Sequence, residues 1–398
     1  MISSTGVRHD SMRARNLAVV LGELHRGGPL TRAALAELTG LTKTTVSTLV
    51  ADLLESGVAV ESGAVRDGER GRPGVAVSLS GHRVATLGLE INVDYLAVCV
   101  VDLTRAVRLR RTLPVDNRNS RPDDTLRRLR ELADAATSEA ERSGLRIAGA
   151  ALAVPGPVQD GLLCNAPHLG WRDVRVSDLL DLPLAVENEA NLAALGELWF
   201  GSAEPDFLYV SGEIGIGAGL VVDGSVFRGT HGLAGELGHV VVTPDGPACR
   251  CGGRGCLEVY AGQDALLGGA ASMADLVALL EAGDRTALAG CAEAGRALGL
   301  ALTSAVHLLD PGMIVLGGVY APLFPWLEGD VRATLSARLG QMRRVPPPLA
   351  VSETGADAAV LGAAGLVIQQ IIADPARAPR LWSEPSSGPS SGPSSGPR

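Results

Sequence analysis

The sequence contains few aromatic residues and a single lysine. Phe, Trp and Tyr make up 3% of the 398 residues, and Lys43 is the only lysine, so arginine supplies nearly all of the positive charge. The hydrophobic content of 46% is enough for a large core, which Ala, Val and Leu must fill because large rings are scarce. A chain of this length is expected to form two or three domains.

The chain is acidic overall and lacks targeting segments. The net charge of −9 argues against broad, nonspecific binding to nucleic acid or acidic membranes, but leaves room for a small DNA-binding module. Residues 1–20 lack the apolar stretch of a signal peptide, and we find no apolar run of the ~20 residues that span a bilayer. We therefore expect a soluble, cytoplasmic protein without a membrane partner.

Cysteine is scarce too, but three of the six cysteines lie close together. Cys249, Cys251 and Cys256 follow His239 within Gly235–Glu258, and nine residues separate His239 from Cys249. Neutral imidazole and thiolates are ligands of tetrahedral zinc, and four protein ligands leave no open position, so we expect a structural Zn²⁺. Disulfides or reduced free cysteines are the alternatives. Zinc is favoured because no signal peptide indicates an oxidising compartment.

Residues 12–80 have the pattern of a winged helix-turn-helix. After a first apolar-periodic helix, Thr31 and Thr42 are candidate N-caps of two further short helices, which Gly40 separates. Leu38 is expected on the inner face of the first of these two helices. Two short helices joined by a glycine-containing turn match a helix-turn-helix, although an ordinary three-helix bundle has the same pattern.

The second of these two helices would be the recognition helix. Its free face offers small hydrogen-bonding groups and one cation, which suit base edges and phosphates in a major groove. The candidate DNA-binding residues of this helix are Thr42, Lys43, Thr44, Thr45, Ser47 and Thr48.

A predicted strand pair with a polar loop follows the helices. Arg72 lies near the tip of the loop at Glu61–Pro73 and could enter a minor groove, which is narrow and negative in A·T-rich DNA. A solvated hairpin is the alternative. Because residues 1–80 hold nine basic and eight acidic residues, binding would depend on placed contacts and dimerisation.

Residues 83–375 alternate between predicted strands and helices. Strands on both sides of an amphipathic helix at Pro122–Arg142 indicate an α/β lobe, and a second lobe begins near residue 200. The SSGP repeat is of low complexity, so we expect residues 383–398 to be a disordered tail, native or added, outside the fold.

Two stretches of this region are candidates for ligand binding. Asn188 and Glu189 stand where a predicted strand becomes a helix, a usual location for ligand groups in α/β folds. Asn188 could equally cap the helix while Glu189 favours its dipole, and both roles are compatible. The glycine-rich run at Glu213–Gly219 could approach a phosphate, but a tight β-hairpin is the simpler interpretation.

Together, these features resemble the ROK family (repressor, open reading frame, kinase) over residues 12–375. The resemblance rests on Gly235–Glu258, which contains the cysteine cluster, and on Val186–Asn191. It implies the two-lobed fold of sugar kinases, hexokinase and actin, with a ligand cleft between the lobes. Regulators of this family carry a winged helix-turn-helix ahead of that domain.

The family includes sugar kinases and sugar-responsive repressors, and three elements of this chain depart from the kinases. Glu90–Asp94 replaces an Asp-x-Gly-Gly-Thr phosphate loop, Glu213–Gly217 lacks the threonine of a second phosphate turn, and Glu189 replaces the catalytic Asp. Additional carboxylates repel phosphates, and the extra methylene of Glu moves the base by about 1 Å. We therefore expect no kinase activity.

The residues on the sugar side are better retained. By resemblance, a sugar pocket would be lined by Asn188, Glu189, Glu236, His239 and Glu258. Converging carboxylates and amides suit sugar hydroxyls. His239 would bind zinc through one ring nitrogen and face the sugar with the other.

We expect a transcriptional regulator, a repressor of carbohydrate-utilisation genes, with a degenerate kinase domain as its sensor. Its partners would be a double-stranded DNA operator and a sugar or sugar-phosphate effector. A homodimer or larger homo-oligomer is expected because such modules usually bind two half-sites. The alternatives are an active ATP-dependent ROK sugar kinase with a DNA-binding head, and a ligand-independent scaffold in which zinc serves stability.

Overall fold

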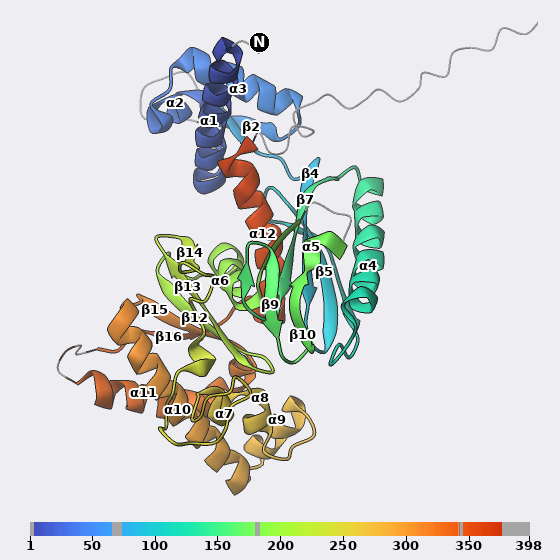
Figure 1. Cartoon of the computed structure of the whole chain (residues 1–398). Helices are drawn as coiled ribbons and strands as arrows, with labels where there is room; N and C mark the ends of the chain where they lie inside the picture. The colour runs from blue at the N-terminus through green and yellow to red at the C-terminus, as the bar shows by residue number, and fades with distance from the viewer. Residues whose placement is uncertain (1–3, 66–73, 180–183, 341, 343–344, 376–398) are drawn as a thin grey trace, which may run out of the picture.

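The computed structural model describes residues 4–65, 74–179, 184–340, 342 and 345–375. It consists of a helical head at the N-terminus and two α/β lobes, and helix α12 (Ala358–Ala373) runs from between the lobes toward the head (Figure 1). The expected fold, a winged helix-turn-helix followed by a two-lobed domain, is confirmed. The expected tail at 383–398 lies outside the described residues.

The head begins with three helices, and the second and third of them start at local capping signals. Thr31 Oγ1 accepts a hydrogen bond from the Ala34 amide at 3.2 Å, and Thr42 Oγ1 accepts one from the Thr45 amide at 3.1 Å. Gly40 ends the second helix in the left-handed conformation, at φ +69°. The three helices are α1 (Ser4–Gly27), α2 (Arg32–Thr39) and α3 (Lys43–Glu55).

A small sheet completes the head. Its strands, in the order β1-β3-β2, are β1 (Leu30–Thr31), β2 (Ala59–Val65) and β3 (Gly74–Leu79). The expected strand pair is thereby confirmed, while Arg72 lies outside the described residues. The expectation for Leu38 was wrong: it is 57% exposed, because Leu35 and Ala36 form the buried side of the short helix α2.

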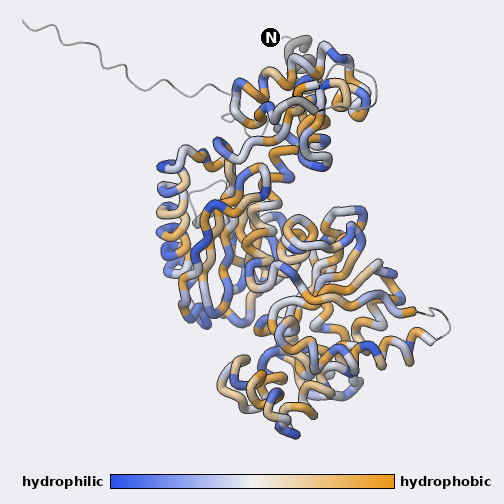
Figure 2. The backbone as a smooth tube through the Cα atoms, turned by 180° about the vertical axis from the view of Figure 1, so that it is seen from behind, coloured by the Kyte–Doolittle hydropathy of each residue, from blue (hydrophilic) through white to orange (hydrophobic). Residues whose placement is uncertain are grey.

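The first lobe is built on a five-stranded sheet of order β11-β7-β4-β5-β6. Helix α4 (Pro122–Arg142) covers one face and α12 covers the other. Figure 2 shows hydrophilic residues along α4, the outermost helix at the left of that view. The strands are β4 (Val84–Ile91), β5 (Tyr95–Asp102), β6 (Val107–Pro114), β7 (Arg146–Val154) and β11 (Leu184–Asn188).

A second, three-stranded sheet of order β10-β9-β8 extends from the first lobe. The sequence patterns predicted no strands here, because the segments are short and carry few β-branched residues. This sheet supplies part of the wall of the pocket described below. It consists of β8 (Val158–Gln159), β9 (Leu162–Ala166) and β10 (Trp171–Arg175), and helix α5 (Val176–Leu179) follows.

The second lobe has a sheet of order β14-β13-β12-β15-β16, with its helices below in Figure 1. The glycine-rich run forms an antiparallel β12–β13 hairpin, so the simpler interpretation is confirmed. The strands are β12 (Phe207–Gly212), β13 (Ile216–Val222), β14 (Ser225–Phe227), β15 (Met313–Gly318) and β16 (Leu349–Val351). The helices are α7 (Glu258–Ala261), α8 (Gln263–Leu267), α9 (Met273–Glu281), α10 (Arg285–Leu309) and α11 (Tyr320–Leu339).

Helices α6 (Glu189–Phe200) and α12 pack against each other with their backbones in contact. A Cβ added to Gly362 would lie 1.7 Å from the carbonyl oxygen of Leu192, and one added to Gly196 would lie 2.1 Å from that of Ala358. Glycine is therefore required at both positions. Although α12 comes last in the chain, it belongs to the first lobe, so the lobes are not two successive segments.

Helix α12 also corrects an expectation about membrane spans. Residues Gly355–Ala373 are long and apolar enough to cross a bilayer, although no such run was expected from the sequence. Of this window, 67% is buried inside the protein, between the first lobe and α6. Composition of this kind is also typical of a central core helix, which is the role that α12 has here.

Candidate functional site

The candidate recognition helix α3 presents its polar face to solvent. Thr42, Lys43, Thr44, Ser47 and Thr48 are exposed and Thr45 is half-buried, whereas the opposite face of α3 is buried in the head. Three of the hydroxyls already have local partners, because Thr42 Oγ1 lies 2.9 Å from Thr45 Oγ1 and Thr48 Oγ1 donates to the Thr44 carbonyl. Among the described residues, the side chains of Lys43 and Ser47 have no such bond and are available to a ligand.

A pocket of about 390 Å³ lies between the two lobes. The first lobe contributes loops and the small sheet, α6 contributes its first turn, and the second lobe contributes the β12–β13 turn and the cysteine segment. All five predicted sugar-binding residues line this pocket: Asn188, Glu189, Glu236, His239 and Glu258. The structure therefore brings together residues that are up to 70 positions apart in the sequence.

Asn188 has a structural role at this pocket. Its Oδ1 accepts hydrogen bonds from the amides of Ala190 and Asn191 at 2.9 and 3.2 Å, so it caps α6. Its Nδ2 donates to the Gly156 carbonyl at 2.9 Å. An amide group has two acceptor sites and two N–H donors, so one N–H of Asn188 remains for a ligand.

Glu187 holds this capping segment in place. Its carboxylate accepts hydrogen bonds from the Asn188 amide at 2.9 Å and from Asn191 Nδ2 at 3.1 Å, and it pairs with Arg228 of the second lobe. Because Arg228 follows β14, this ion pair connects the two lobes beside the pocket. Sequence patterns gave no sign of it, since the partners are 41 residues apart.

Two pocket carboxyls have strongly shifted pKa values. Burial raises the pKa of Glu189 to about 8, and the neighbouring Glu213 raises it further in the same direction. Burial also raises the pKa of Glu213 to about 7, although a hydrogen bond from Asn92 opposes the shift and Asp94 adds to it. At neutral pH and without a ligand, these two groups are therefore at least partly protonated.

The imidazole of His239 lies between the pocket and the cysteines. Its Nδ1 is 3.9 Å from Cys249 Sγ, and its Nε2 is 3.8 Å from Glu236 Oε2. One ring nitrogen thus faces the cysteines and the other faces the pocket. This is the arrangement expected for a residue that serves both sites.

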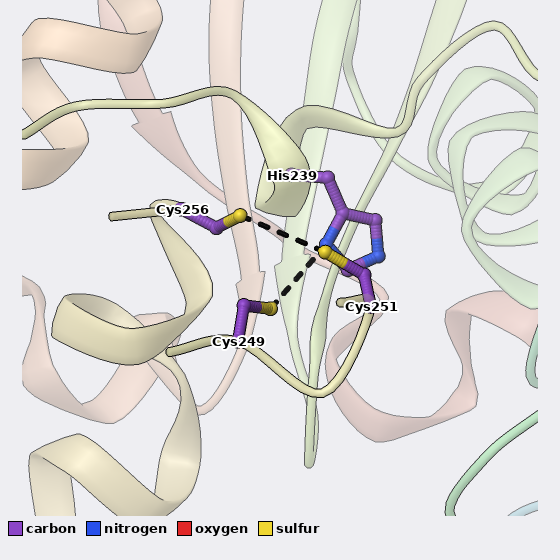
Figure 3. Close-up of side chains that lie close together, drawn as sticks. All are labelled: His239, Cys249, Cys251 and Cys256. Atoms are coloured by element: carbon purple, nitrogen blue, oxygen red, sulfur yellow. Dashed lines mark hydrogen bonds between the residues drawn. The ribbon is translucent and has the colours of Figure 1, made fainter. Parts of the chain in front are cut away.

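The side chains of His239, Cys249, Cys251 and Cys256 converge on one point, as Figure 3 shows. One ligand atom of each lies within 4.8 Å of all the others, so the cluster can hold a metal ion. Cys251 Sγ and Cys256 Sγ are 3.8 Å apart, which excludes a bond between them. Sulfurs bound at about 2.3 Å to one tetrahedral ion also lie about 3.8 Å apart, so this spacing fits zinc.

Two basic residues at the mouth of the pocket, Arg250 and His168, were not predicted from the sequence. Arg250 Nη1 lies 3.1 Å from Nδ1 of His168, and its Nη2 lies 3.2 Å from Asp264. Burial lowers the pKa of His168, and Arg250 lowers it further while Glu258 opposes this. Arg250 stands between two candidate metal ligands, Cys249 and Cys251, and this position could have indicated that it lies near the site. No neighbouring sequence feature indicated that His168 does.

Family profiles match most of the chain. The ROK family profile matches residues 86–370, and the MarR family profile matches residues 18–70 of the head. The xylose repressor of Bacillus subtilis is 29% identical over 370 residues, covering 90% of this chain and 96% of the repressor. A glucokinase of Thermotoga maritima is 31% identical over 252 residues, covering 54% of this chain and 78% of the kinase.

Solved structures match either nearly the whole chain or only the part that follows the head. A ROK family transcriptional regulator, described as a homolog of the E. coli MLC protein, superposes with a TM-score of 0.75 at 25% identity. It covers 93% of this chain and 99% of its own. The ROK hexokinase of Thermus thermophilus superposes with a TM-score of 0.59 at 32% identity, covering 70% of this chain and 97% of its own. The regulator matches the head as well, whereas the hexokinase leaves more than a quarter of this chain unmatched.

Proposed function

Because the chain belongs to the ROK family and has a winged helix-turn-helix ahead of the ROK domain, we propose that it is a sugar-responsive repressor of carbohydrate-utilisation genes. One observation carries the proposal: a single chain joins an exposed polar recognition helix to a pocket lined by all five predicted sugar-binding residues. The full-length similarity to a xylose repressor and to a ROK regulator structure supports it.

The head would bind double-stranded DNA through α3, with Lys43 at a phosphate and the neighbouring hydroxyls at base edges. The free hydroxyl of Ser47 and the exposed ammonium of Lys43 support this assignment. A homodimer would place two such helices in successive major grooves. Operator DNA as the partner implies a cytoplasmic location.

The cysteine cluster would hold a structural Zn²⁺ with His239, Cys249, Cys251 and Cys256 as its four ligands. The ion would supply no chemistry to a substrate, since no coordination position is left open. Its contribution would be to fix the segment that carries Glu236 and Glu258, which are pocket residues on either side of the cluster. His239 would thereby join the metal site to the effector.

We infer that the pocket signals to the head through α6 and α12. Glu197, three residues before the end of α6, is 2% exposed and accepts hydrogen bonds from Ser352 and from the amides of Glu353 and Thr354. Helix α12 starts at Ala358, after one 3-10 turn at Gly355–Asp357 that follows this segment. A change at the first turn of α6 would therefore reach the start of α12.

The other end of α12 reaches the head. Ile368 and Ile371 of α12 belong to one buried cluster with Val20, Leu21 and Leu24 of α1 (Figure 1). A sugar that binds one lobe arrangement better than another would shift the population of arrangements and move the head. In a dimer, this movement would change the spacing of the two recognition helices.

We also propose that the chain has no kinase activity. By resemblance to the kinases, Glu90 and Glu213 stand where phosphates would approach, so their side chains block the approach and ionisation of either would repel a phosphate. An active sugar kinase with a DNA-binding head is the second candidate. The similarity to glucokinases and the carboxyl of Glu189 at the position of the catalytic base favour it.

The test is a gel shift with the promoter region that flanks the gene, at moderate salt, with and without a panel of sugars. Sequence-specific binding that a sugar weakens is the expected result. Absence of specific binding under every condition would contradict the proposal. A coupled assay of ADP release with the same sugars tests the second candidate, and turnover that Glu189→Ala abolishes would establish it.

A further inference from the structure

Three carboxyls from three different elements meet behind the effector pocket, and of these Glu90 is buried while Glu189 and Glu213 are half-buried. Glu90 is the second-last residue of β4 in the first lobe, Glu189 begins α6, and Glu213 follows β12 of the second lobe. All three line a small cavity of about 20 Å³ together with Tyr95 and Ser211. A cavity of this size has room for about one water-sized group.

The carboxyl of Glu90 has one buried oxygen atom that lacks a hydrogen bond within the described part of the chain. It is 3% exposed, and its Oε1 accepts a hydrogen bond from the Tyr95 hydroxyl at 2.8 Å. Its Oε2 is buried without any hydrogen-bond partner among the described residues. A buried polar atom without a partner destabilises the folded state, so an unpaired oxygen in this place indicates a missing donor.

The small cavity adjoins the effector pocket, because Glu189 and Glu213 line both. The walls of the larger pocket carry four carboxyls, and Arg250 is the one arginine among them. That guanidinium is already within 3.2 Å of Asp264, at the mouth of the pocket. The part of the pocket next to the small cavity therefore has several carboxyls that can accept hydrogen bonds or become negatively charged. The hydroxyl groups of a neutral sugar do not require so many.

We propose that the effector is an amino-bearing sugar whose ammonium group lies between Glu189 and Glu213 and faces Glu90. This inference rests on the proposed function, since it names the chemical class of the effector. An ammonium group has three N–H donors, and the site offers one carboxyl from each of three elements. Since these elements belong to both lobes and to α6, one cationic group would hold the lobes together.

Two other occupants fit less well. A metal ion with bonds of about 2.0–2.6 Å needs closely spaced oxygens. Among the described residues, the His239 cluster is the only group of three or more potential ligands whose atoms all lie within 4.8 Å of one another. Among the described residues, the lining of the small cavity offers a phosphate no cation, and ionisation of Glu90, Glu189 or Glu213 would repel it, so a sugar phosphate is disfavoured at this end of the pocket.

The protonation of these carboxyls supports the proposal and gives it a signature. The raised pKa values, about 8 for Glu189 and about 7 for Glu213, reflect burial without a cation. An ammonium ion would lower both pKa values, so its binding would release protons, and affinity would rise above pH 6 until the amine of the sugar loses its own proton. A neutral sugar that accepts hydrogen bonds from protonated carboxyls would show the opposite trend.

Other titratable groups near the site bear on this signature. Asp94 lies near the site in the β4–β5 turn, and Tyr95 lies near it at the start of β5. The charge of Asp357, just before α12, raises the pKa of Glu90. The wider pocket adds Glu236, Glu258, His168, His239 and Arg250. Because any of these groups could contribute protons, the test compares variants of Glu213 rather than relying on a single pH profile.

The test is titration calorimetry of the full-length, zinc-loaded protein with matched sugars. The panel pairs glucose with glucosamine, N-acetylglucosamine, 3-amino-3-deoxyglucose and 6-amino-6-deoxyglucose, and it includes xylose. Measurements in two buffers of different ionisation enthalpy give the number of protons released. We expect one amino sugar to bind at least about tenfold more tightly than its hydroxyl and N-acetyl counterparts, with proton release.

Glu213→Gln keeps the shape of the side chain and removes its charge, so it should abolish most of this preference. Glu281→Gln, at the exposed end of α9, is the matched control and should keep it. If a neutral sugar binds more tightly than every amine and releases the operator, the inference is wrong while the proposed function stands. If no sugar binds, both are contradicted.

Discussion

The ring of His25 in α1 lies 4.8 Å, centroid to centroid, from the ring of Trp199 in α6. Arg105, in the β5–β6 turn, lies 5.6 Å from the same Trp ring and donates to the Trp199 carbonyl at 3.1 Å and to the His25 carbonyl at 3.4 Å. Trp199 stands ten residues after Glu189 on the same helix. The first turn of α6 therefore lines the pocket between the lobes, while its last turn contacts the helical head.

Trp199→Ala should uncouple the two sites. The variant is expected to bind DNA and sugar with affinities close to those of the unchanged protein, but sugar should no longer weaken DNA binding. Fluorescence anisotropy of labelled operator, with and without effector, measures this response. Trp199→Phe retains a ring and is the control. An unchanged response in Trp199→Ala would show that signalling does not use this contact.

Removing the charge of Glu189 should stabilise the ligand-free protein at high pH. The folded-state pKa of about 8 lies above the ordinary value of 4.5, so stability is lost as pH rises through this range. Glu189→Gln is therefore expected to raise the thermal midpoint by at least about 2 °C at pH 8 and to have little effect at pH 5. Differential scanning calorimetry at both pH values measures the difference. An equal effect at the two pH values would contradict the assigned protonation.

Loss of the metal should remove the response to sugar. Cys251→Ser deletes one of four candidate ligands, so the variant is expected to lose bound zinc, as measured by atomic emission, together with the effect of sugar on DNA binding. Cys164→Ser, in β9 and outside the cluster, should keep both. A zinc-free variant that still responds normally would mean that the ion only stabilises the fold.

Removing the ammonium of Lys43 should weaken DNA binding at every sequence. Lys43→Ala is expected to lower the slope of log affinity against log salt concentration by about 1, because one fewer phosphate is neutralised. Arg285→Ala removes an equally exposed positive charge from the second lobe and is the control. Equal effects of the two variants would contradict a phosphate contact at Lys43, and sugar affinity should be unchanged in both.

Features with a local cause could be predicted from the sequence. The caps at Thr31 and Thr42, the bounds of α4 at Pro122–Arg142 and the cysteine cluster each depend on residues that are neighbours in the chain. Side chains that the family motifs mark, such as Glu189 and Glu236, were also assigned to the pocket in which they lie.

Features that depend on tertiary contacts could not be predicted in this way. The small sheet that carries Asn165 and His168 into the pocket is too short to produce a periodic pattern. The return of α12 to the first lobe depends on backbone contact with α6, for which an isolated Gly362 is no signal. Glu90 in β4 and Glu213 after β12 are 123 positions apart in the sequence, and only the fold brings them to the same small cavity.

The glycines that bring α12 against its neighbours restrict how the lobes can move. Besides the contacts with α6, a Cβ at Gly88 of β4 would lie 2.1 Å from the Val360 carbonyl oxygen, so α12 is in backbone contact on two sides. Where side chains separate two packed elements, they can change rotamers as the elements slide past each other. Where backbones are in direct contact, no side chains lie between them to adjust in this way. We therefore expect closure of the lobes to be a hinge motion and not shear along α12. The bending would then fall to the segments that cross between the lobes, residues 201–206 and 352–354.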